Sequence, residues 1–329
     1  MHSKPAAGVL ITLLALGCGD SDAPIDSAVD ADAGPAALPR DTVPSGQIGD
    51  VPSEPRAGTC DFRGGSGAAE ADACTGEASA WFFVSRFEFS EPETVDGELR
   101  VLGFDLDDVH SHGGRDPSGC GVRDAVSLDG MHGGVDNTGA LLVPSVDMIL
   151  TSDLRTTAET AIAEGRFGIL IELRHWNGTG DDDCVDVVVH EAVPVAPLEL
   201  DASGAPIGGQ SFAIQNEPRV FVGETLVADE LRADLGGFPV PQPFMMDLQS
   251  AHLRLQWLGT RFIGVVAGDL PAETVAASLF CREERLPMDV LMRITSDVSD
   301  LRPSDAEADC LGISWAFRIA TVDARVADI

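Results

Sequence analysis

The chain has 329 residues, of which 54 are acidic and 21 are basic, and its formal net charge at pH 7 is −33. A negative field of this size repels nucleic acids and anionic lipid headgroups, so we expect no nucleic-acid partner. Tyrosine is absent and Lys4 is the only lysine. This composition excludes phenolic acid–base chemistry and, once an N-terminal leader is removed, any phosphate-loop or Schiff-base lysine.

The N-terminus has the layout of a secretory signal peptide. Lys4 supplies a short positive region, and an apolar run follows from Ala6 to Leu16. This run is too short to cross a bilayer, which needs ~20 apolar residues. Small Gly17 comes next and is followed directly by Cys18. We therefore expect residues 1–17 to be a cleaved signal peptide.

The stretch Leu14-Ala15-Leu16-Gly17-Cys18 resembles the lipobox of bacterial lipoproteins. The resemblance implies cleavage before Cys18, acylation of its thiol, and a membrane-lipid partner through the attached chains. Ala15 and Leu16 stand in the reverse of the commonest order of that motif. Gly19, in place of an aspartate, is similar to an outer-membrane address, so we expect a lipid-anchored protein of the outer membrane or cell surface. The alternative is a plain secreted protein with an incidental Cys18.

Residues 18–59 are rich in proline, alanine and aspartate and contain no aromatic side chain. Such a segment buries too little apolar surface to offset its chain entropy, so it predicts a disordered acidic linker. Residues 60–329 then form an extracytoplasmic domain, and a subdivision near residues 195–210 is an open alternative.

Several segments of this domain alternate between apolar and polar residues with the period of a half-buried strand. In the first of them, Trp81, Phe83, Phe87 and Phe89 are expected on one face. The run from Phe167 to Leu173 is apolar on both faces except at Glu172, which favours a central position in a sheet. The predicted strands cover residues 81–89, 99–106, 166–173, 185–190, 253–257 and 313–320.

Predicted helices are few and short. One covers residues 153–164 and ends before Gly165, a second begins near Asp269 with Pro271 in its first turn, and a weaker third covers 289–298. Many short strands with few helices predict a mainly β fold, an antiparallel β-sandwich-like domain.

Cysteines beyond the lipobox are even in number, which in an exported chain predicts disulfides. No Cys-x-x-Cys spacing is present, so a zinc ribbon or redox motif is not supported. Nearness in the sequence favours the pairs Cys60–Cys74, Cys120–Cys184 and Cys281–Cys310, among the fifteen pairings that six cysteines allow.

Aspartate and glycine gather at 103–114 and 128–137, and a third acidic cluster lies at Asp181, Asp182, Asp183 and Asp186. These regions predict a calcium site, because calcium takes oxygen ligands from flexible loops. Asp105 and Asp107 would project from the same side of a strand. No EF-hand spacing is present. The alternative is that these residues hold tight turns through local backbone hydrogen bonds. The full candidate set is Asp105, Asp107, Asp136, Asn137, Asp181 and Asp183.

A histidine cluster is the alternative metal site. His110 and His112 form a His-x-His pair that would share one strand face, and the intervening loop could bring His132 near them. Three imidazoles with one open position are typical of catalytic zinc. No HExxH spacing supports this hypothesis, and exposed loop histidines are its alternative.

The order Gly-Phe-Asp-Leu-Asp from Gly103, then Cys120, then Asp129-Gly130 through Asp136-Asn137 looks like a pattern of uncharacterised lipoproteins of myxobacteria and related bacteria. The segment from Asp309 to Phe317 is similar to the closing strand of those proteins. The resemblance spans most of 97–325 and implies no activity. The sequence therefore predicts a lipid-anchored envelope protein, a non-catalytic binding or structural module with calcium as its candidate cofactor and an unidentified protein or glycan partner. The alternative is a metal-dependent hydrolase using the three histidines.

Overall fold

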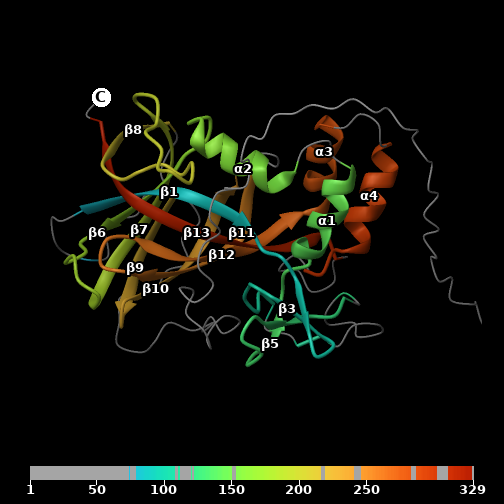
Figure 1. The fold of residues 1–329 in the computed structure, drawn as a ribbon. Helices are drawn as coiled ribbons and strands as arrows, with labels where there is room; N and C mark the ends of the chain where they lie inside the picture. Colours follow the sequence, from blue (N-terminus) through green and yellow to red (C-terminus); the bar gives the residue numbers. More distant parts are fainter. Residues whose placement is uncertain are drawn as a thin grey trace, which may run out of the picture. The chain divides into compact units, whose positions relative to one another are not determined.

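A computed structural model describes residues 74, 79–107, 110–111, 120, 122–149, 153–215, 219–240, 246–282, 287–301 and 310–327. Nine strands form one sheet, shown in Figure 1. They are β1 (Ser79–Phe89), β6 (Ile169–Arg174), β7 (Asp182–Pro194), β8 (Gln210–Ile214), β9 (Arg219–Val227), β10 (Glu230–Val240), β11 (Met246–Trp257), β12 (Phe262–Pro271) and β13 (Gly312–Val326). The predicted signal peptide, the predicted linker, Cys18, Cys60 and His112 lie outside the described residues.

The sheet closes on itself into a barrel-like ring. Antiparallel pairings run in the order β1, β6, β7, β9, β10, β11, β12 and β13, and β13 pairs again with β1. Strand β8 lies across one end, antiparallel to β7 and parallel to β13. The predicted mainly β, antiparallel class with few short helices is confirmed. The predicted central position of Phe167–Leu173 is also confirmed, because β6 lies between β1 and β7.

Aromatic side chains fill the inside of the ring. The rings of Phe82 on β1 and Phe262 on β12 have centroids 5.0 Å apart, although β13 separates these two strands. Trp176, which follows β6, lies at the same centroid distance from Trp257 on β11. Contacts between strands that are not neighbours require that these side chains point inward. A fully buried ring such as Phe82 or Phe262 contributes about 2–3 kcal/mol through the hydrophobic effect.

A bulge in β1 corrects the predicted aromatic face. The register with β13 shifts between Val84 and Arg86, so the alternation reverses at that point. Phe87 and Phe89 contact Phe317, on the same side as Phe82. Phe83 lies on the other side of the strand and stacks on Phe212 of β8. The prediction of one face for all four aromatic residues is therefore wrong.

A second, four-stranded sheet lies on the outside of the ring. Its strands are β2 (Glu93–Val95), β3 (Glu98–Val101), β4 (Ala125–Ser127) and β5 (Gly133–Val135). The chain leaving β3 attaches to the ring through Leu102 and Phe104, which are buried against Val265, Ala267 and Ala316. This attachment holds the segment that carries Asp105 and Asp107.

Four helices are described: α1 (Gly139–Ile149), α2 (Leu154–Ala163), α3 (Ala272–Arg282) and α4 (Met288–Asp297). The Asp153 side chain caps α2 by accepting from the Arg155 N–H at 2.8 Å. The predicted start near Asp269 is wrong, because β12 continues through Pro271. Helices α3 and α4 pack against each other (Figure 1). In the described part of the chain no helix is long and apolar enough to cross a membrane.

Two disulfides are present among the described residues, Cys74–Cys184 and Cys120–Cys310, with Cα atoms 5.5 and 5.8 Å apart. All three predicted pairs are wrong, because each contains a cysteine that bonds elsewhere. Nearness in the sequence fails as a guide because the ring closes through strands from opposite ends of the chain. Cys310 lies two residues before β13, and the disulfide ties it to the connection between β3 and β4. The suggested subdivision near 195–210 falls on the connection between β7 and β8, which pair with each other.

Candidate functional site

Three predicted calcium ligands come together in the structure. One carboxylate oxygen each from Asp105, Asp107 and Asp136 lies within 4.8 Å of the other two. Asp136 is buried, whereas Asp105 and Asp107 are half-buried. We call these three residues the carboxylate cluster.

Backbone pairing sets the position of the cluster. Phe104 and Asp136 form an isolated antiparallel bridge, in which the Asp136 N–H donates to the Phe104 carbonyl at 2.8 Å. The Leu106 N–H donates to the Asp136 carboxylate at 2.7 Å. Asp105 and Asp107 flank Leu106, so this hydrogen bond holds both of them beside Asp136.

Two glycines allow the segments to approach so closely. A Cβ at Gly103 would lie 2.9 Å from the Asp136 carbonyl oxygen. Gly134 has a φ of +79°, and a Cβ there would lie 3.1 Å from an Asp105 carboxylate oxygen. A larger residue at either position would push the two sides of the cluster apart.

The electrostatics of the cluster disfavour an ionised Asp136. Burial raises the pKa of Asp136 well above its usual range, and the carboxylates of Asp300, Asp107 and Asp124 raise it further. The hydrogen bond from the Leu106 N–H lowers this pKa but does not cancel the rise. Asp300 is itself buried, and burial raises its pKa to about 6. Ser314 donates to Asp300 through its hydroxyl and through its N–H, the latter at 2.9 Å. A cation bound at the cluster would offset this repulsion between carboxylates.

The geometry suits a hard divalent cation. Calcium binds oxygen ligands at about 2.3–2.6 Å, so two of its ligands lie up to about 5 Å apart. The spacing of the three carboxylate oxygens is within this range. The donor set is all oxygen, which is the chemistry of calcium rather than of zinc.

Asn137, the fourth predicted ligand in this region, has a different role. Its side-chain oxygen accepts from the N–H groups of Ala140 and Ala316, at 3.1 and 3.2 Å. Its side-chain nitrogen donates to the Leu102 carbonyl at 2.6 Å. These bonds join β13, the start of α1 and the chain leaving β3, and they occupy both lone pairs of the oxygen. We therefore leave Asn137 out of the ligand set.

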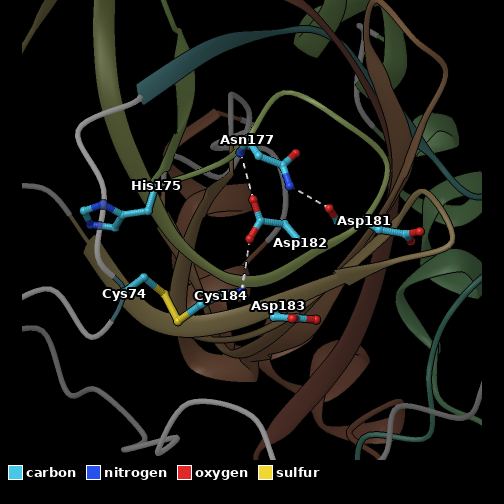
Figure 2. A pocket seen from close by; sticks show the side chains of 7 residues that line it. All are labelled: Cys74, His175, Asn177, Asp181, Asp182, Asp183 and Cys184. Atoms are coloured by element: carbon cyan, nitrogen blue, oxygen red, sulfur yellow. Dashed lines mark hydrogen bonds between the residues drawn. A yellow bond between two sulfur atoms is a disulfide. The ribbon is translucent and has the colours of Figure 1, made fainter.

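Asp181 and Asp183, the remaining predicted ligands, lie in the hairpin between β6 and β7. They border a hollow of about 430 Å³, which Figure 2 shows with its lining side chains. The lining residues of this hairpin hollow are Cys74, His175, Asn177, Asp181, Asp182, Asp183 and Cys184. None of the carboxylate cluster lines it, so the six predicted ligands do not form one site.

Backbone groups occupy several oxygens of the hairpin hollow. The Asp182 carboxylate accepts from the Asn177 N–H at 2.8 Å and from the Cys184 N–H at 3.2 Å (Figure 2). The Asp181 carboxylate accepts from the Ala228 N–H at 2.6 Å, which ties the hairpin to the turn between β9 and β10. Here the turn-holding alternative describes the side chains, as expected for aspartate and asparagine in tight bends.

The structure places His110 and His132, two residues of the predicted histidine cluster, beside β5. His110 is exposed, and its ring lies against Gly133, where a Cβ would be 2.5 Å from its Cε1 atom. Within the part of the chain that the structure describes, the group of potential metal ligands that converges contains neither histidine. Because His112 lies outside that part, the three-histidine site stays a prediction.

Sequence reasoning missed Asp124 and Asp300, which both raise the pKa of Asp136. Asp124 accepts a hydrogen bond from the Ser111 N–H, and Asp300 follows α4 at the entry to β13. Neither belongs to a dense aspartate–glycine segment, so only the fold brings them near the cluster. No family model matches the chain, and no curated protein or solved structure matches it either.

Proposed function

We propose that this chain is an exported, lipid-anchored protein of the cell envelope, a non-catalytic binding or structural module whose fold calcium stabilises. The observation that carries the calcium part is the convergence of the Asp105, Asp107 and Asp136 oxygens within 4.8 Å. The disulfides support export, because such bonds persist in oxidising compartments. The leader with its Cys18 supports the anchor.

Thermal unfolding with calcium or with EDTA tests the cation. We expect calcium to raise the unfolding midpoint of the wild type and Asp107→Asn to abolish that rise. Asp183→Asn is the matched control, because it removes a carboxylate from the hairpin hollow and leaves the cluster intact. Without calcium, Asp107→Asn should be more stable than the wild type, since it removes a charge that raises the pKa of Asp136.

Elemental analysis of the purified protein distinguishes the two metal hypotheses. One calcium per chain, lost in Asp107→Asn, supports the proposal. Stoichiometric zinc that is lost on replacement of His110 or His132 would instead support the metal-dependent hydrolase. Binding of neither metal, together with unfolding that calcium does not change, would contradict the calcium part.

Detergent partitioning tests the anchor separately. We expect the wild type to enter the detergent phase with a fatty-acylated N-terminal Cys18, detected by mass spectrometry of its first peptide. Cys18→Ser should stay in the aqueous phase or remain uncut, and Ser21→Ala should behave as the wild type. An unmodified Cys18 in a mature, membrane-bound protein would contradict the anchor and leave the calcium proposal standing.

A further inference from the structure

The seam between β9 and β10 is the weakest join in the ring. β10 pairs with β11 along its whole length, from Glu230 to Val240. Its pairing with β9 has only three register partners, from Glu230 opposite Val227 to Arg232 opposite Thr225. No further pair of these two strands is formed among the described residues, so the ladder stops at Thr225.

Glu224 lies at the point where this ladder stops. On its other side, Glu224 is the register partner of Val185 of β7, and the β7–β9 register is irregular on both sides of that pair. The Asp234 N–H donates to the Glu224 carboxylate. A side chain therefore provides a join between the strands where the backbone ladder has ended.

The Glu224 carboxyl is placed unfavourably for a charged group. Only 9 % of the residue is exposed, and in the described part of the chain its Oε1 atom has no hydrogen-bond partner. The charged groups that face it are the carboxylates of Asp234 on β10 and Asp186 on β7. An ionised Glu224 would be a buried negative charge that is repelled by the carboxylates of Asp234 and Asp186.

Each flanking carboxylate has a histidine on its far side. His252 Nδ1 of β11 lies 2.6 Å from Asp234 Oδ1, and His175 Nε2, next to the end of β6, lies 3.3 Å from Asp186 Oδ2. A row of ionisable groups thus runs from His175, the residue after β6, across the four strands β7, β9, β10 and β11, with Glu224 at its centre. The two histidines contact the flanking aspartates, and among the described residues both charges that shift the pKa of Glu224 are carboxylates.

We propose that Glu224 is a proton-controlled latch of the β9–β10 seam. With a proton on its carboxyl, Glu224 sits buried between its two acidic neighbours and the seam is closed. When the proton is lost, the carboxylate moves into water and β9 separates locally from β10. The ring thereby has a wall segment that opens as the pH rises.

The expected pH range follows from proton linkage. Burial and then the Asp234 carboxylate raise the pKa of Glu224 from 4.5 to about 8 in the closed seam. Below 4.5 both closed and open forms carry the proton, and above about 8 neither does. Between these limits only the open form releases it, so the opening constant rises about tenfold per pH unit.

Hydrogen exchange on the purified full chain tests the latch. Protection factors, corrected for intrinsic rates, are measured from pH 5 to 9 for the amides of Thr225, Arg232 and Asp234, which point across the seam, and, for comparison, for Val265 and Phe317. In the wild type we expect the protection factors of the seam amides to fall about tenfold per pH unit up to pH 8 and then to stay constant. Glu224→Gln should remove this slope at the seam, and Glu98→Gln, a substitution of an exposed strand residue in the outer sheet, should keep it.

Two results would overturn the proposal. One is a slope that persists in Glu224→Gln; the other is seam protection equal to that of Val265 and Phe317 at every pH, which means opening only by global unfolding. Should Glu224→Gln fail to fold, Asp234→Asn decides the matter. This variant leaves Glu224 in place and removes one of the negative charges that raise its pKa. The pH at which seam protection stops falling must therefore move lower. An unmoved levelling-off would equally refute the latch.

Discussion

The hairpin between β6 and β7 and the carboxylate cluster beside β5 are both rich in aspartate, and they differ in what their oxygens face. In the hairpin, Asp181 and Asp182 accept N–H groups from the backbone. In the cluster, three carboxylates approach one another within 4.8 Å, and Asp136 receives one N–H, from Leu106.

This difference separates turn-building aspartates from candidate ligands. Backbone N–H groups neutralise a carboxylate locally and fix the turn around it, so nothing further is needed. Carboxylates whose oxygens lie within 4.8 Å of one another raise the cost of ionisation, and together they could hold a cation. Composition is similar in both places, and the direction of the side chains decides the chemistry.

Removing the disulfides should cause the largest loss of unfolding free energy, and each disulfide supports a different one of the two regions. Cys74–Cys184 borders the hairpin hollow, and Cys120–Cys310 ties the β3–β4 connection to the entry of β13. For separations of 110 and 190 residues, chain entropy predicts that each double Cys→Ser variant loses about 5 kcal/mol. Denaturant unfolding measures this loss. Only the Cys120/Cys310 variant should also lower calcium affinity, and equal calcium affinity in both would break the comparison.

Asp300 should give the second-largest effect, because its ionisation makes the free energy of unfolding depend on pH. Its pKa is about 6 in the fold and 3.8 as the reference value, so the folded chain holds a proton that the unfolded chain releases between these values. The contribution of Asp300 to stability is therefore fully present below pH 4 and is lost as the pH rises to 6. This amounts to about 3 kcal/mol for one group shifted by about two units.

Asp300→Asn should remove that part of the pH dependence, because an amide does not ionise and can still bond with Ser314. Unfolding free energies at pH 4, 5, 6 and 7 measure it, with Asp183→Asn as the hairpin control. An Asp300→Asn profile parallel to that of the wild type would show that the region beside the cluster carries no buried ionisation cost.

The alternation of side chains predicted several strands, including residues 313–320 of β13, and missed β12. Strand β12 is buried on both faces over Phe262–Ala267, because one face lines the ring and the other meets the outer sheet. No period of two remains in such a segment. Strand β10 was missed for another reason, since Gly236, Gly237 and Pro239 have the composition of a turn. Helix α1 was missed because Pro144 lies inside it.

The site was predictable only where its residues are dense in the sequence. Asp105 and Asp107 lie two residues apart, and the second aspartate–glycine segment contains Asp136, so composition found all three. The same composition also made Asp181 and Asp183 predicted calcium ligands. What a carboxylate contacts depends on how the strands pair, and the sequence does not show that pairing. Asp300 and the disulfide partners depend on the closure of the ring, which joins residues far apart in the chain.

The smallest effect concerns the hairpin and tests the comparison most directly. Asp182→Ala removes the acceptor of two N–H groups, from Asn177 and Cys184, so we expect a loss of about 1–2 kcal/mol in unfolding free energy. The exposed Asp183 is the control, and Asp183→Ala should change stability by about 0.5 kcal/mol or less. Because the hairpin carboxylates bond to backbone N–H groups and not to a cation, the loss of unfolding free energy in each variant should be the same in calcium and in EDTA. If either substitution abolished the calcium-induced rise in the unfolding midpoint, the two regions would belong to one binding site, and the distinction drawn from the direction of their oxygens would fail.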